Sequence, residues 1–120
     1  MIKVEKTAKT LDEGTKNLMA GAKDDYKQNS LMGRSELSSY CKEKLENFES
    51  QTTVREGKKY IKVIYDRSVF AFIVKEDFKH FKKGDVLKPA GWAAPALNQP
   101  RGNVLTGNYP IQWTGPLYLN

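Results

Sequence analysis

Apolar residues in the first part of the chain follow a helical spacing. A single stripe at alternating steps of four and three residues runs through Val4, Ala8, Leu11, Thr15, Leu18, Ala22 and Tyr26. Side chains spaced in this way share one face of a helix, so the pattern predicts a helix over about residues 3–28. Gly14 and Gly21 each weaken that helix by about 1 kcal/mol relative to alanine. A stripe this narrow therefore requires close packing against another element.

A second amphipathic segment follows a polar break. Gly33 and the polar run 28–30 interrupt the first helix, and Ser35 can cap a second one. The second helix would place five residues on one face, namely Leu37, Tyr40, Cys41, Leu45 and Phe48. Two such helices form a hairpin, which either covers the sheet of its own chain or pairs with a second protomer. The narrow stripe favours pairing, so residues 1–50 are expected to be an oligomerisation segment.

In the second half of the chain the spacing of apolar residues changes to every second residue, as in a β-strand. The segments Lys58–Asp66 and Ser68–Lys75 are rich in β-branched and aromatic residues, and a turn signal separates them. This pattern predicts a β-hairpin. In its first strand, Lys62 lies on the same face as Tyr60 and Ile64. Both faces of the second strand are apolar, so that strand is expected to be central in the sheet.

The C-terminal part predicts short strands and one long irregular loop. A short strand is expected at Val86–Lys88, followed by a loop over residues 89–103. A final hairpin would join Asn103–Leu105 to Tyr109–Thr114, with Leu117–Leu119 as an edge strand.

Together these elements predict an α+β protein. An N-terminal helical hairpin would be followed by a small antiparallel β-sheet or open barrel. A length of 120 residues fits a single domain over 1–120, able to bury one modest core. The β core would occupy residues 58–120 and carry the loop 89–103 on its surface.

Charge is distributed unevenly along the chain. Residues 1–50 carry nine basic and nine acidic residues, whereas residues 51–120 carry eleven basic and five acidic ones. The net charge of +6 therefore lies in the C-terminal part, and no acidic residue follows Asp85. This composition is typical of a surface that receives an anionic ligand.

Catalytic and metal-binding chemistry is not expected. The chain has one histidine, His80, and one cysteine, Cys41, whereas a transition-metal site needs several such ligands. A nucleophile would have to use His80 as its base, and neither GxGxxG nor GxxxxGK[ST] occurs. We therefore expect neither an enzyme nor a cofactor. No apolar run approaches the ~20 residues of a membrane span, and a single cysteine favours a cytosolic location.

The loop GWAAPALNQPRGN, residues 91–103, offers the chemistry of a binding site. A purine could stack on Trp92 for about 1–3 kcal/mol, and Arg101 could hold a phosphate by charge-assisted hydrogen bonds. Asn98 and Asn103 could read a base edge or sugar hydroxyls. Trp92 could equally be a lid over the sheet, and Arg101 to Asn103 could be turn chemistry. Because association costs about 4–15 kcal/mol, tight binding would need walls from a partner protomer.

The stretch SVFAFIVKEDFKHFKKGDVLKPAGWAAPALNQPRGNVLTGNYPIQWTG, within residues 58–115, resembles phage proteins of the first type of Thoeris anti-defence sponge. The resemblance implies a homo-oligomer, a dimer or a higher assembly up to a hexamer, in the host bacterial cytoplasm. It also implies that cyclic ADP-ribose isomers are sequestered intact in pockets between protomers. The family requires an aromatic residue, an asparagine and arginines, and the matching positions are Trp92 or Phe81, Asn98 or Asn103, and Arg101, Arg55 or Arg67.

Three functions follow as hypotheses. The first is a non-catalytic sponge for cyclic nucleotide immune signals, which counters bacterial anti-phage defence. The alternative is a small basic nucleic-acid-binding module, although nucleic acid is the less expected partner. The third is a phosphodiesterase or nucleosidase that degrades the same cyclic ligand. A polyanion binder would lose affinity steeply with salt, whereas a pocket for two phosphates would lose little.

Overall fold

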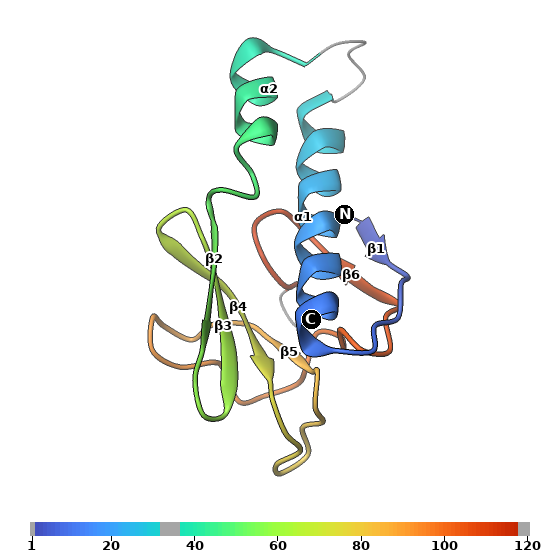
Figure 1. The fold of residues 1–120 in the computed structure, drawn as a ribbon, viewed down its shortest axis with the longest axis vertical. Coiled ribbons are helices and arrows are strands. Elements are labelled where there is room, and N and C mark those ends of the chain that lie inside the picture. Colours follow the sequence, from blue (N-terminus) through green and yellow to red (C-terminus); the bar gives the residue numbers. More distant parts are fainter. Residues whose placement is uncertain (1, 32–36, 118–120) are drawn as a thin grey trace.

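The computed structural model describes residues 2–31 and 37–117 and has an α+β fold (Figure 1). The fold class expected from the sequence is therefore correct. A strand precedes the first helix, however, so the chain does not begin with a helical hairpin. The elements in chain order are β1 (Ile2–Val4), α1 (Leu11–Leu31), α2 (Ser39–Glu46), β2 (Thr52–Glu56), β3 (Tyr60–Tyr65), β4 (Ser68–Val74), β5 (Val86–Leu87) and β6 (Tyr109–Ile111).

Helix α1 begins later than its apolar stripe indicated. Thr10 Oγ1 accepts the backbone N–H of Glu13 at 3.1 Å and so caps the helix. Asp12 and Glu13 occupy the first turn, where the helix dipole favours negative charge. Val4 belongs instead to β1, opposite Tyr109 of β6. The predicted start of the helix, at residue 3, is therefore wrong. Residues 2–4 pair with the distant strand β6 and form β1, so they are not available to the helix.

The small residues of α1 permit close packing within the chain itself. A β-carbon added at Gly14 would lie 2.7 Å from Cβ of Val104, and one added at Gly21 would lie 2.6 Å from Cγ2 of Val4. Leu18, between them on the same face, is fully buried. The narrow stripe is thus covered by β1 and by the segment around Val104. A second protomer is not needed to bury it.

Helix α2 is shorter than the sequence indicated. Ser38 is its N-cap, and its Oγ accepts the backbone N–H of Cys41 at 3.2 Å. The expected cap Ser35 and the expected break at Gly33 lie outside the described residues. Tyr40, expected on the apolar face, is exposed. The face that α2 buries is therefore narrower than its sequence pattern indicated.

The larger sheet contains four antiparallel strands in the order β2–β3–β4–β5. The predicted β3–β4 hairpin is confirmed, and Asp66 adopts a left-handed conformation in its turn. Strand β4 is interior, as its two apolar faces indicated. Strand β2 was not expected from the sequence. It is an edge strand whose last four residues are exposed, so it lacks the apolar alternation that reveals a half-buried strand.

The smaller sheet pairs the first strand with the last, β1 with β6. The hairpin expected between Asn103–Leu105 and Tyr109–Thr114 is therefore wrong. Asn103 instead heads a turn, in which its backbone carbonyl accepts the N–H of Gly107 at 2.9 Å. The expected edge strand Leu117–Leu119 extends beyond the described residues.

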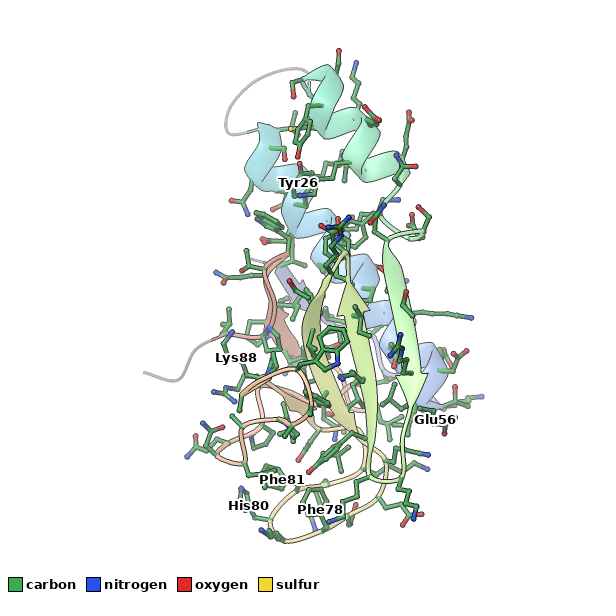
Figure 2. All side chains as sticks on the ribbon, turned by 90° about the vertical axis from the view of Figure 1, so that its left-hand side faces the viewer. Tyr26, Glu56, Phe78, His80, Phe81 and Lys88 are labelled. Carbon is green, nitrogen blue, oxygen red and sulfur yellow. The ribbon has the colours of Figure 1, made fainter. Side chains whose placement is uncertain are left out.

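Apolar clusters cover both faces of the larger sheet. The inner face packs with α1, β1 and β6 in one cluster. The outer face carries a second cluster of Phe72, Val74, Phe81 and Leu87. Figure 2 looks onto this outer face, with α1 behind the strands and with Phe78 and Phe81 near one end of the molecule. The outer face is the part of the sheet that the 89–103 loop can reach.

Tyr109 is buried, and its hydroxyl has no hydrogen-bond partner among the residues that the structure describes. Because an unpaired buried hydroxyl is unfavourable, Tyr109→Phe should raise the free energy of unfolding at neutral pH by about 1 kcal/mol. Burial also raises the pKa of this hydroxyl above its usual 10.0. Above that pH the unfolded chain ionises Tyr109 and the folded chain does not, so wild-type stability falls.

Urea denaturation at pH 7 and above pH 10 measures both effects. The phenylalanine variant should lose less stability between the two pH values than the wild type. A variant that is less stable than the wild type at pH 7 would show that the hydroxyl is paired.

Candidate ligand-binding surface

A row of side chains crosses the outer face of the larger sheet. Arg55 on β2 lies opposite Lys62 on β3, and Lys62 lies opposite Phe72 on β4. Residues that are directly opposite in an antiparallel pair share a face, with β-carbons about 4.5–5.5 Å apart. Arg55 is exposed, Lys62 is half-buried and Phe72 is buried. The row therefore runs from a charged edge to an apolar interior.

Trp92 lies at the tip of a tight turn in the 89–103 loop. The carbonyl of Ala94 accepts the backbone N–H groups of Ala90 and Gly91 at 3.0 and 3.2 Å, which closes the turn. Trp92 is 52% exposed, and a β-carbon added at Gly91 would meet no atom within 4 Å. About half of the Trp92 side chain is therefore open to solvent, which is unusual for a tryptophan.

Lys62 joins this tip to the sheet. Its Nζ lies 4.2 Å from the centroid of the Trp92 ring and 5.9 Å from that of Phe72. A cation–π contact at an exposed site contributes about 0.5–1 kcal/mol, whereas a nucleobase stacked on an aromatic side chain contributes about 1–3 kcal/mol. A base can therefore displace the ammonium group, which is then free to meet a phosphate. We call Arg55, Lys62 and Trp92 the Trp92 surface.

Arg101 and Asn98 lie together, as expected, but they hold the loop in shape. Arg101 Nη1 donates to Asn98 Oδ1 at 2.9 Å and to the carbonyl of Gln99 at 3.0 Å. The Asn98 carbonyl contacts His80 Nε2 at 2.7 Å. Burial lowers the pKa of Arg101, and its Nε is buried without an acceptor among the described residues. The guanidinium is therefore only partly satisfied by its own loop.

Lys88 adds a further cation beside Arg101. Burial lowers the pKa of Lys88, and the charge of Arg101 lowers it further. Lys88 Nζ donates to the carbonyl of Pro116 at 2.8 Å, which ties the start of the loop to the C-terminal segment. Two neighbouring cations raise the positive potential around the loop and so favour anionic ligands.

Phe81 is not a stacking platform. It is fully buried, with its ring centroid 5.2 Å from Phe78 and 4.0 Å from His80 (Figure 2). Neither face of its ring is open to a base. The stacking role considered for Phe81 is therefore wrong, because the second apolar cluster encloses an aromatic residue that lies within a charged stretch of sequence.

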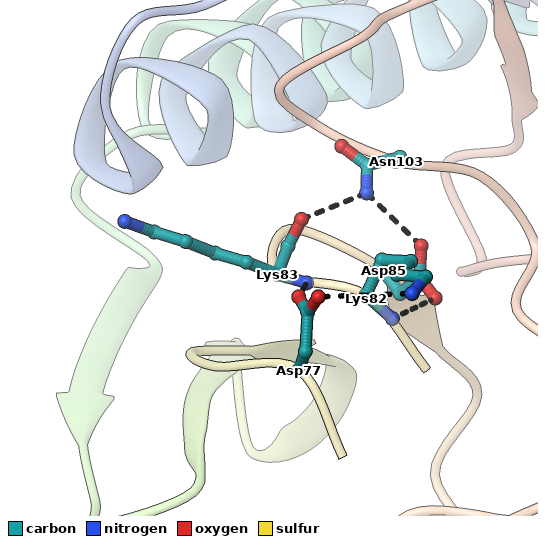
Figure 3. A network of polar contacts seen from close by, with 5 residues as sticks. All are labelled: Asp77, Lys82, Lys83, Asp85 and Asn103. Atoms are coloured by element: carbon teal, nitrogen blue, oxygen red, sulfur yellow. Dashed lines mark hydrogen bonds and ion pairs between the residues drawn. The ribbon is translucent and has the colours of Figure 1, made fainter. Parts of the chain in front are cut away.

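Asn103 is fully engaged by its own chain. Its Nδ2 donates to the carbonyl of Lys83 at 2.9 Å and to Asp85 Oδ1 at 3.0 Å (Figure 3). Its Oδ1 accepts the backbone N–H groups of Leu105 and Thr106. Two donors and two acceptor positions are thus used. Asn103 builds a turn, so it is not free to read a ligand.

Two carboxylates in the same network satisfy backbone groups. Asp77 Oδ1 accepts the N–H of Lys83 at 2.7 Å, and Asp85 Oδ2 accepts the N–H of Lys82 at 2.8 Å (Figure 3). Each carboxylate stabilises the turn that connects β4 to β5. Their geometry serves folding of this segment and does not pair them with each other.

Arg67 lies away from the Trp92 surface. It is exposed in the β3–β4 turn, five residues along the chain from Lys62. Strand β3 ends at Tyr65, about 10 Å along the strand from Lys62 at about 3.3 Å per residue, and Arg67 lies in the turn beyond that end. Of the seven residues considered from the sequence, Arg55 and Trp92 are the two exposed ones that both neighbour Lys62. Lys62, which its sequence pattern does not indicate as a site residue, lies between them.

Within residues 2–31 and 37–117, no group of three or more His, Cys, Asp or Glu side chains could hold a metal ion. No helix there is both long and apolar enough to cross a membrane.

A comparison with known protein families gives a match over nearly the whole chain. A family model described as "Family of unknown function (DUF7717)" matches residues 2–119. No curated protein and no solved structure matches the chain.

Proposed function

We propose that this chain, which belongs to the DUF7717 family of unknown function, binds single-stranded nucleic acid without catalysing a reaction. The observation that carries the proposal is the exposed Trp92 ring with the Lys62 ammonium 4.2 Å from its centroid. Arg55 is the cross-strand neighbour of Lys62, so a second cation lies beside the aromatic platform. Proteins that bind single strands combine stacking aromatics with such backbone-tracking cations.

The openness of the surface favours a polymer over a single nucleotide. One stacked base and two charge-assisted hydrogen bonds contribute about 9 kcal/mol at most, whereas association costs about 4–15 kcal/mol. A lone nucleotide on an open tip therefore gains little. A strand can continue onto other parts of a chain with a net charge of +6, and each further phosphate contact releases counterions.

Sequestration of a cyclic nucleotide is the second candidate. It is favoured by the Arg101 guanidinium, whose buried Nε has no acceptor among the described residues and which shares a loop with Asn98 and Trp92. This function would require a second copy to wall off the ligand. A sponge would release the ligand intact after denaturation, whereas an enzyme would release a cleaved one.

Fluorescence anisotropy with a labelled oligothymidine at low salt tests the first proposal. Trp92→Ala should weaken binding by at least about fivefold, because it removes one stacking contact. Arg55→Ala should weaken it more than Arg67→Ala, which removes the same charge from the β3–β4 turn, beyond the end of β3. A folded Trp92→Ala variant shows an unchanged far-UV circular dichroism spectrum.

Two outcomes would contradict this assignment. Equal losses in the two arginine variants with no loss in Trp92→Ala would indicate diffuse attraction of a polyanion. Sequestration would be supported instead if the wild-type protein does not bind the oligonucleotide but binds a cyclic ADP-ribose isomer or a cyclic dinucleotide in native mass spectrometry.

A further inference from the structure

The two edge strands of the larger sheet differ in whether another segment of the chain covers them. At the β5 edge, Val86 donates its N–H to the carbonyl of Gly102 and accepts the N–H of Arg101, both at 2.8 Å. That edge is therefore covered by the chain itself. At the other edge lies β2, which pairs only with β3 among the described strands (Figure 1). An uncovered edge strand is a template for pairing with another chain.

The hydrogen bonds at the two ends of β2 fix which peptide groups point outward. Gly57 donates to the Tyr60 carbonyl at 2.9 Å, and Asp66 donates to the Gln51 carbonyl at 2.8 Å. Because bonded and non-bonded pairs alternate in an antiparallel ladder, Thr53 and Arg55 bond to β3. The peptide groups of Thr52, Val54 and Glu56 therefore point away from the sheet. The N–H of Thr52 is already used by the Glu49 carbonyl at 3.1 Å.

An apolar hollow lies beside this edge on the α1 side of the sheet. Its volume is about 420 Å³, and Met19, Phe48 and Val54 contribute to its lining. Val54 is 50% exposed. Charged residues of both signs also line it, namely Asp12, Lys16 and Glu49.

We propose that the occupant of this edge is a second copy of the chain, with the two β2 strands antiparallel about a two-fold axis at Val54. Each Val54 then exchanges two backbone hydrogen bonds with the Val54 of the other copy. The two side chains lie next to each other over the apolar hollows. The β2 strand carries one cation and one anion, Arg55 and Glu56, and in this register each lies directly opposite a threonine of the other copy, so copies with a net charge of +6 can meet here without like charges directly opposite each other.

Neighbouring registers are disfavoured. A shift of two residues in one direction places Arg55 directly opposite the Arg55 of the other copy, and like charges in that position are repulsive. A shift of two residues in the other direction places Glu56 opposite Ser50, where the chain has left the strand and entered a turn. The Val54 register is the one that uses the whole of β2.

Sedimentation equilibrium over a range of protein concentrations tests this proposal. The wild type should approach twice its 13.6 kDa mass as its concentration rises. Val54→Glu and Val54→Lys should each remain monomeric, because like charges meet at the two-fold axis. An equimolar mixture of the two variants should dimerise again, because opposite charges then face each other. Arg67→Glu, an exposed change in the β3–β4 turn, should dimerise like the wild type.

The charge-swap mixture makes the test specific for the register. Val54 is half-exposed on an edge strand, so the variants should keep the wild-type circular dichroism spectrum. A wild type that is monomeric at every concentration, a Val54→Glu variant that still dimerises, or a mixture that stays monomeric would each overturn the proposal. Dimerisation needs no ligand and should persist in Trp92→Ala, so this result and the nucleic-acid result can fail separately.

Discussion

Gly21→Leu should lower the free energy of unfolding by about 2 kcal/mol. A β-carbon at this position would lie 2.6 Å from Cγ2 of Val4 and 3.1 Å from Cγ2 of Ile111, so α1 would have to move away from β1 and β6. Overpacking of this kind costs about 1–3 kcal/mol or more. Replacement of a helical glycine returns about 1 kcal/mol of helix propensity, which offsets part of the loss.

Ala20→Leu is the matched control for this substitution. Ala20 is the neighbouring helical residue and is exposed, so a leucine there has space. Urea denaturation should show the control variant within about 0.5 kcal/mol of the wild type. If both variants lose the same stability, the close approach of α1 to β1 is not what constrains Gly21.

Asp25→Ala should lower the free energy of unfolding by about 3 kcal/mol. Asp25 is fully buried on α1, and its Oδ2 accepts the backbone N–H of Trp113 at 2.9 Å and Asn29 Nδ2 at 3.2 Å. The first bond joins residues 88 apart in sequence and fixes the turn after β6 against the helix. Its loss leaves a backbone donor without its acceptor, which costs about 1–3 kcal/mol, and more where the lost acceptor is charged.

Two variants make this experiment specific. Asp25→Asn keeps an acceptor oxygen and should lose less stability than Asp25→Ala. Asp24→Ala removes a carboxylate from the exposed neighbouring position and should be close to neutral. Thermal unfolding followed by circular dichroism ranks the stabilities of Asp25→Ala, Asp25→Asn and Asp24→Ala. Equal losses for Asp24→Ala and Asp25→Ala would contradict a role for the Trp113 bond.

Local patterns in the sequence are sufficient to predict the central β3–β4 hairpin. Runs of β-branched and aromatic residues around a turn correctly predicted β3 and β4, and the two apolar faces of β4 correctly predicted its interior position. The β1–β6 pair could not be found in this way, because Val4 and Tyr109 are far apart in sequence and meet only in the folded chain. The same pairing shortened the expected first helix.

The candidate site was predictable only in part. The sequence indicates Trp92 as an aromatic residue in a loop that also carries Arg101, Asn98 and Asn103, and it indicates Arg55 only through the resemblance. The signal for Lys62 was present as the single charged residue on a strand face with Tyr60 and Ile64. Burial of Phe81 and saturation of Asn103 depend on tertiary contacts, which residue type and spacing do not encode.

The salt dependence of oligothymidine binding tests the central claim most directly. Two phosphate contacts, from Arg55 and Lys62, predict that the logarithm of the association constant falls against the logarithm of salt concentration with a slope of about −1.4 or steeper. Arg55→Ala should make this slope shallower by about 0.7, while Trp92→Ala should weaken binding without changing the slope. An association constant that does not change with salt, or a wild type that does not bind the oligonucleotide at low salt, would contradict the account.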